Sequence, residues 1–235
     1  MNKEMKISEI VNKLINIKDE VFCRYAIEND LLYRKIKEED YDELILKSIE
    51  CGESYALKII EETGTNNVKK MVNELGLMLN ELENSPEATR ILFASFTTPN
   101  KITLMKNPLE KIDSLMKNES EEIKKKFNSE KISDILLAHE MFHFIENKYK
   151  ASIYTQNKKI LLWKFLKFEN NSNLRVLSEI AAMSFAKTIL EIDYSPFILD
   201  ILLLYPYDQI SSMSLMERVL EIAENYEREN RYETA

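Results

Sequence analysis

Leu137-Ala138-His139-Glu140-Met141-Phe142-His143-Phe144-Ile145 is the most informative stretch of this 235-residue chain, because it contains both histidines of the sequence. The histidines are four positions apart, and a glutamate directly follows the first. Four residues make about one helical turn, so both imidazoles project from one face, about 6 Å apart along the axis. Two neutral imidazoles placed in this way can share a metal ion, and zinc accepts imidazole nitrogen in a roughly tetrahedral shell.

Glu140 lies about 100° round the helix from His139, too far to be the next ligand but close enough to reach a water on the metal. The metal acidifies this water, and the carboxylate removes its proton and later passes one to the leaving amine. The pattern is typical of a zinc-dependent peptide hydrolase. The alternative is a structural pair of histidines. The apolar flanks from Ile132 to Ile145 favour chemistry, because buried polar groups need partners that a metal and its water supply.

A third ligand must come from Asp, Glu, Cys or Tyr, since the chain has no third histidine. Glu146 shares the helical face, but it is about 10.5 Å along the axis from His139, too far to converge on one ion. Glu179 is the better candidate, because it is an isolated acid in an apolar helical segment beside the small residues Ala181 and Ala182. The alternative is that Glu179 only caps or solvates the first turn of that helix.

The order of two motifs then resembles a known family. His139-Glu140-x-x-His143 followed by Glu179-x-x-Ala182-x-x-Phe185-Ala186 is similar to the gluzincin zinc peptidases, most closely their ImmA/IrrE-like branch. The resemblance covers about residues 68 to 190. It implies that His139, His143 and Glu179 bind Zn²⁺, and that Glu140 is the catalytic base.

The sequence departs from the family pattern at one position, and the resemblance also indicates a class of substrate. Thermolysin-like relatives carry an Asp four residues after the ligand Glu, which orients a histidine, but this chain has Met183 there. Another group must therefore orient the histidine. Members of the ImmA-like branch cleave repressor proteins, so the resemblance implies a protein or peptide substrate, such as a regulatory protein.

The expected fold is α+β: a mostly helical, zincin-like domain with a small sheet beside the motif helix, and an N-terminal helical region. We divide the chain into residues 1–65, helical and packed on the remainder, and residues 66–235, the metallopeptidase domain. In zincins the edge strand offers backbone groups to an extended substrate; the alternative is that the strands are only scaffold.

Periodicity and turn residues predict the individual elements. Helices are expected near 7–15, 21–32, 41–62, 67–76, 108–116, 119–127, 158–169, 174–190, 194–204 and 213–226. Gly64 is expected to end the helix at 41–62. Strands are expected at 77–82, 90–97 and 101–105. Ser129 or Ser133 is expected to cap the motif helix. Trp163, the sole tryptophan, is expected in the core rather than as a substrate platform.

Composition narrows the class of protein. Net charge is −8, which disfavours direct nucleic-acid binding because such a protein needs a basic face. No apolar run reaches the length of a membrane span, and Cys23 and Cys51 are far apart and read as buried free thiols. We therefore expect a cytoplasmic protein with no membrane partner, while the oligomeric state stays open.

Two other interpretations remain. One is a catalytically inactive metal-binding interaction or sensor module with a zincin fold; against it, a purely structural site needs no Glu140 and usually has a fourth protein ligand. The other is a helical interaction protein with an accidental motif, which binds no metal. For oxyanion stabilisation the candidates are Tyr149, Tyr154, Tyr194, Tyr205 and Tyr207.

Overall fold

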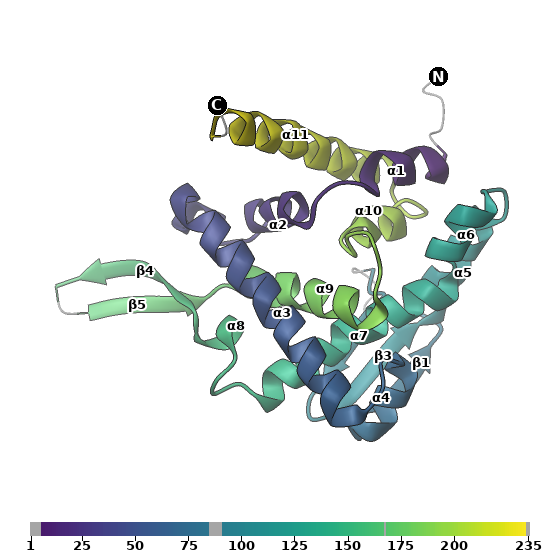
Figure 1. The fold of residues 1–235 in the computed structure, drawn as a ribbon, viewed down its shortest axis with the longest axis horizontal. Helices are drawn as coiled ribbons and strands as arrows, with labels where there is room; N and C mark the ends of the chain where they lie inside the picture. The colour runs from purple at the N-terminus through teal and green to yellow at the C-terminus, as the bar shows by residue number, and fades with distance from the viewer. Residues whose placement is uncertain (1–5, 85–90, 167, 234–235) are drawn as a thin grey trace.

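The computed structural model describes residues 6–84, 91–166 and 168–233. Mostly helical, it holds a three-stranded sheet and a two-stranded hairpin, so the expected α+β class is confirmed (Figure 1). The elements are α1 (Ile7–Leu14), α2 (Asp19–Glu28), η1 (Tyr33–Lys35), η2 (Glu38–Asp40), α3 (Tyr41–Thr63), α4 (Val68–Glu74), β1 (Met78–Leu82), β2 (Ala94–Thr97), β3 (Lys101–Met105), α5 (Lys106–Met116), α6 (Glu121–Phe127), α7 (Ser129–Lys148), α8 (Tyr154–Asn157), β4 (Lys159–Phe165), β5 (Phe168–Asn173), α9 (Arg175–Leu190), α10 (Ile198–Leu204) and α11 (Gln209–Glu233).

Helix α7, which carries the histidine motif, lies at the centre of the fold. It packs against α4, α5, α6 and α9 and against strands β2 and β3. Its N-cap is Asn128, whose Oδ1 accepts from Lys131 N at 2.8 Å. The expected caps, Ser129 and Ser133, were therefore wrong. Asn128 stands one residue before the helix in extended conformation, which places its short side chain at the free amides of the first turn.

The three-stranded sheet confirms the expected strands beside the motif helix. Its order is β1-β3-β2, with β1 parallel and β2 antiparallel to β3. Phe96 of β2 packs edge-on against Phe144 of α7, with ring centroids 6.1 Å apart. Within the described residues, β2 pairs with β3 alone, so one edge of this strand is left for other partners.

Helices α3 and α9 cross at very close range. A Cβ on Gly52 of α3 would lie 2.2 Å from the carbonyl oxygen of Ala181 on α9, so a side chain does not fit at this position. Buried residues of α3, α7 and α9 belong to one hydrophobic core. The N-terminal helices therefore pack on the remainder of the chain, as expected, while the division at residue 65 stays a prediction.

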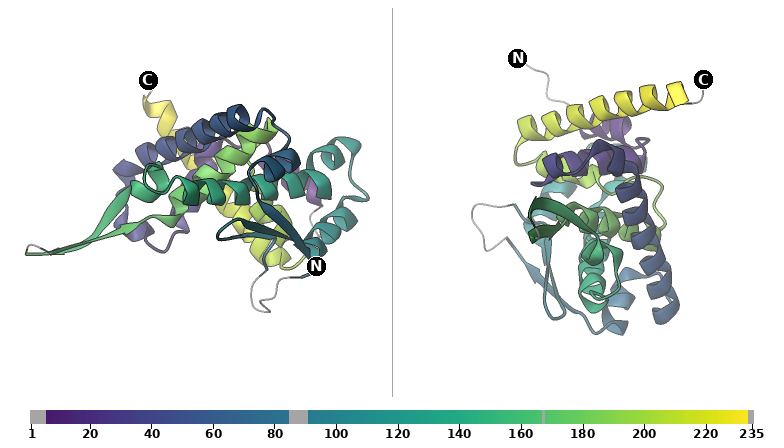
Figure 2. Two further views of the ribbon diagram at one scale, coloured as in Figure 1. Left: turned by 90° about the horizontal axis from the view of Figure 1, so that it is seen from below. Right: turned by 90° about the vertical axis from the view of Figure 1, so that its left-hand side faces the viewer.

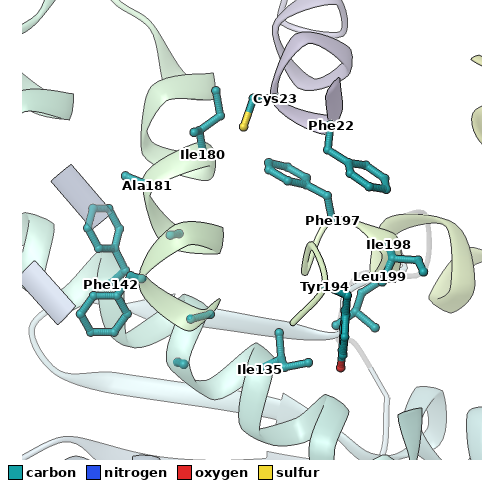
Figure 3. Close-up of a cluster of buried hydrophobic side chains, with 14 of the residues drawn as sticks. Phe22, Cys23, Ile135, Phe142, Ile180, Ala181, Tyr194, Phe197, Ile198 and Leu199 are labelled. Carbon is teal, nitrogen blue, oxygen red and sulfur yellow. The ribbon is translucent and has the colours of Figure 1, made fainter. Parts of the chain in front are cut away.

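The core extends on the far side of α9 to α2 and α10. Phe22 of α2 stacks on Phe197 with ring centroids 6.4 Å apart, and Cys23 lies close by (Figure 3). Cys23 and Cys51 are buried and unpaired, as expected. Helix α10 is largely buried, and none of the described helices is both long and apolar enough to cross a bilayer.

Residues 158–169 differ from the expectation. They were predicted to form a helix, but β4 and β5 pair as an antiparallel hairpin that projects from the body of the protein (Figures 1 and 2). The Trp163 side chain is 53% exposed, so its expected place in the core was also wrong. The Leu-rich run of β4 has no alternation to signal a strand, and a bulge between Leu161 and Trp163 disturbs the period further.

Candidate metal centre

Three potential ligand atoms converge between α7 and α9. His139 Nε2 lies 3.2 Å from His143 Nε2 and 3.2 Å from Glu179 Oε2, and His143 Nε2 lies 3.9 Å from the same oxygen. The two histidines are one turn apart on α7, and Glu179 is in the second turn of α9. The structure thus brings together the three residues that the sequence analysis named as ligands, the only such group among the described residues.

The spacing of these atoms fits a small divalent cation. The three separations leave a point about 2 Å from each atom, which matches zinc–nitrogen and zinc–oxygen bond lengths. The two facing Nε2 atoms cannot both carry a proton toward each other, whereas a shared cation accepts both lone pairs. The side chains are 12%, 20% and 31% exposed for His139, His143 and Glu179, so the group is partly shielded but reachable from solvent.

The pKa values of His139 and Glu179 reflect how close their side chains are. Burial disfavours the charged imidazolium of His139, but the hydrogen bond and the charge of Glu179 outweigh it and raise the pKa of His139. Burial likewise disfavours the Glu179 carboxylate, but the hydrogen bond and charge of His139 lower the pKa of Glu179 to about 2. Glu179 is therefore anionic at neutral pH, which is the state that a metal ligand needs.

Arg175 holds the second oxygen of Glu179. Its Nε lies 3.4 Å from Glu179 Oε1, one helical turn away, while Oε2 faces the histidines. The two carboxylate oxygens therefore have separate partners, an arrangement that suits a monodentate ligand. Because the Arg175 side chain is 83% exposed, this ion pair fixes orientation more than it stabilises the fold.

A buried serine and glutamate orient His143. Ser178 Oγ lies 3.3 Å from His143 Nδ1 and donates to Glu146 Oε2 at 2.8 Å. Since the serine proton is used on Glu146, the serine oxygen accepts the proton of Nδ1. This keeps the Nε2 lone pair of His143 free toward Glu179 and His139. Glu146 itself is 3.8 Å from Nδ1, too far for a direct hydrogen bond.

Hydrogen bonds hold Glu146 as an anion. Burial favours its neutral form, but the nearby His143 and the hydrogen bonds of Thr155, Gln156 and Ser178 together lower the pKa of Glu146. Thr155 Oγ1 donates to Glu146 Oε1, the oxygen that Ser178 does not use. The sequence analysis considered Glu146 only as a ligand and missed this supporting role.

His139 has a different environment at its second nitrogen. Its Nδ1 is buried and has no hydrogen-bond partner in the part of the chain that the structure describes. Asp200 of α10 is close enough to interact electrostatically with both His139 and Glu179. Neighbouring protein groups partly desolvate the Asp200 carboxyl, which remains accessible to solvent, and raise its pKa to about 6. The charge of Glu179 adds to this rise in pKa, and the charge of His139 opposes it.

Met183, where the sequence analysis noted the absence of an Asp, does not line the cleft of the histidines. It lines a separate cavity of about 280 Å³ with Ile180, Lys187 and Phe197. Orientation of His143 comes instead from its own helix, through Glu146, and from Ser178, which immediately precedes the candidate ligand Glu179.

The three ligand candidates lie in a cleft of about 500 Å³. Glu140 lines the same cleft as the expected metal ligands. Residues of β2, of the start of α9 and of the base of the hairpin also line it. The lining consists of Leu92, Ala94, Ser95, Phe96, His139, Glu140, His143, Glu146, Thr155, Gln156, Asn173, Leu174, Arg175, Ser178 and Glu179.

None of the five tyrosines considered for oxyanion stabilisation is in this described lining. Tyr149 donates to Glu62 Oε1 at 3.1 Å, and Tyr194 donates to the Lys126 carbonyl at 3.0 Å, both away from the cleft. The donors that line it include Arg175 and the amides of Gln156 and Asn173. Sequence reasoning gave no signal for these residues, because only the fold places them opposite β2.

Comparisons with protein-family models, with curated proteins and with solved structures found no match for this chain.

Proposed function

We propose that this protein is a zinc-dependent peptidase of the gluzincin type, similar to the ImmA/IrrE-like branch. The observation that carries the proposal is the convergence of His139 Nε2, His143 Nε2 and Glu179 Oε2 in a cleft that Glu140 also lines. Three protein ligands are the number found in catalytic zinc sites, whereas structural sites use four. This count supports an enzyme over an inactive binding module.

His139, His143 and Glu179 would hold the ion, which when bound supplies Lewis acidity toward water and the scissile carbonyl. Glu140 takes the proton of the attacking water and delivers it to the leaving amine. Ser178 and Glu146 keep the proton of His143 on Nδ1. Arg175, Gln156 and Asn173 offer donors to the carbonyl groups of the substrate.

The cleft supports a protein or peptide substrate in extended conformation. Among the described residues β2 pairs only with β3, and β2 lines the cleft together with Glu140, so an extended chain can add to its other edge. We infer that the substrate lies between β2 and the start of α9. A cytoplasmic location is also part of the proposal, since the buried thiols of Cys23 and Cys51 remain unpaired.

The first test is metal content and turnover of three variants. Purified protein is expected to hold about one zinc per chain by elemental analysis. His139→Ala and Glu179→Ala are expected to lose it, because two remaining ligands bind weakly. Glu140→Gln is expected to keep the metal and the unfolding midpoint of the native chain, and to abolish cleavage of a peptide mixture analysed by mass spectrometry.

Each outcome separates the interpretations. Zinc retained by Glu179→Ala would remove that residue from the site. Cleavage retained by Glu140→Gln would exclude it as the base. Zinc binding by the native protein without any cleavage would favour the metal-binding sensor or interaction module, and a native protein that binds no zinc would favour the accidental motif.

A further inference from the structure

The β4–β5 hairpin is unusual because it stands away from the body of the protein. Figure 1 and Figure 2 show it projecting beyond α3 and α8. It is held near its base, where β5 contacts α8, β4 contacts η1, and Asn173 Nδ2 donates to the Gln156 carbonyl at 3.3 Å. Two-stranded hairpins without further support are marginally stable in water. A partner that covers this arm would stabilise it.

The hairpin exposes large apolar side chains that its own fold does not cover. Leu161, Trp163, Leu166 and Phe168 are 46%, 53%, 78% and 71% exposed. The nearby charges of Lys164 and Glu169 pair with each other across the strands. What remains for a partner is aromatic and aliphatic surface, and aromatic residues are enriched at the centres of protein interfaces. Such a patch on a projecting arm indicates an interaction surface.

The base of the hairpin is continuous with the candidate cleft. Gln156 precedes β4, Asn173 ends β5, and both line the cleft beside Arg175. The seven residues of β4 span about 23 Å, so the tip lies well beyond the reach of a short peptide bound at Glu140. A substrate chain that extends from the cleft past Gln156 and Asn173 would therefore contact the hairpin.

Charge selects the kind of chain that fits. Residues 158–173 contain four lysines and one glutamate, although the protein as a whole has a net charge of −8. Lys158 pairs with Glu43 and Lys164 with Glu169, and a surplus of positive charge remains on this arm. This surplus favours a segment with acidic residues. The bulge and lysines of β4 blunt strand pairing with a second copy.

We propose that the β4–β5 hairpin is a docking arm for the protein substrate, and that it binds an extended segment of alternating apolar and acidic residues next to the scissile bond. This rests on the proposed peptidase function and names its substrate class: proteins or long peptides rather than short peptides. Trp163 and Phe168 supply the main apolar contacts. The arm acts on substrate affinity and not on the chemical step.

The kinetic test compares two lengths of one substrate. A short peptide that the native protein cleaves, found by screening a random-sequence peptide mixture, is extended by ten alternating Val and Glu residues at either end. We expect one extension to lower KM about tenfold with kcat unchanged. Trp163→Ser/Phe168→Ser should lose this gain but cleave the short peptide normally. The matched control, Leu57→Ser/Ile210→Ser, removes two exposed apolar side chains elsewhere and should keep the gain.

A second readout does not depend on cleavage. Trp163 is the sole tryptophan, so its fluorescence reports on the hairpin alone. In Glu140→Gln, the Val-Glu peptide should shift the Trp163 emission to shorter wavelength. It should also reduce collisional quenching of this fluorescence by iodide.

The outcomes separate the two proposals. Equal KM for short and extended peptides, or a gain that survives in the hairpin variant, would overturn the docking arm while the peptidase stands. A fluorescence shift from the Val-Glu peptide in a protein that cleaves nothing would show that the hairpin binds such a segment, but it would overturn the peptidase and with it the docking of a substrate. A shift with phosphatidylcholine–phosphatidylglycerol vesicles, or with protein concentration and no peptide, would overturn docking of substrate in favour of a membrane or a second copy.

Discussion

Individual residues of the centre differ in how far the sequence reveals them. His139, Glu140 and His143 were predicted from a spacing that is typical of metal sites, and Glu179 from its isolation in an apolar helix. Ser178 and Glu146 were not predicted in their orienting role, because a serine or glutamate beside a motif has many local uses. The available signal was that Glu146 is one turn after His143, on the same helical face.

At this scale we predict that Glu146→Ala lowers zinc affinity about 10- to 100-fold, as loss of a supporting partner does at other metal sites. Without the carboxylate, Ser178 is free to donate to Nδ1 of His143, which favours the tautomer that cannot bind through Nε2. The measurement is competition with a chelator of known affinity.

Ser184→Ala is the matched control for this prediction. Ser184 is on the same helix as Ser178, but it donates to the Ile49 carbonyl at 3.1 Å, on the side of α9 that faces α3. Its removal should change stability and leave zinc affinity unchanged. Equal affinity of Glu146→Ala and native protein would show that the network is not needed to orient His143.

At the scale of elements, the crossing of α3 and α9 sets the position of Glu179. We predict that Gly52→Ala destabilises the protein by about 1–3 kcal/mol, because its methyl group would meet a backbone carbonyl and force the helices apart. Chemical denaturation of the metal-free protein measures this. Glu61→Ala, at an exposed position of the same helix, should change stability little, and equal losses in both variants would argue against a tight crossing.

Most elements could be predicted because their signals are local. The apolar face of α1, the Gly64 stop of α3 and the strands around Pro99 were all expected, and all are present. The hairpin could not be predicted, since leucines suit a helix as well as a strand and the polar strand β5 resembles a loop.

For the whole molecule, the question is whether residues 66–235 form a domain without the N-terminal helices. We predict that this fragment neither unfolds cooperatively nor binds zinc, because removal of α3 exposes the face of α9 that includes Ala181 and Phe185. Near-ultraviolet circular dichroism and zinc titration test it. A folded, zinc-binding fragment would establish the boundary at residue 65 as a true domain boundary.

The central position of α7 has a consequence for how the cleft works. Since helices and strands surround α7, the backbone amides of the histidine motif should exchange with solvent only when the entire protein unfolds. The side chains of the site are then already in place before a substrate binds. A substrate of the proposed peptidase must adopt an extended conformation to fit this groove, so the loss of conformational entropy falls on the substrate. Unstructured chain segments are therefore favoured over folded ones.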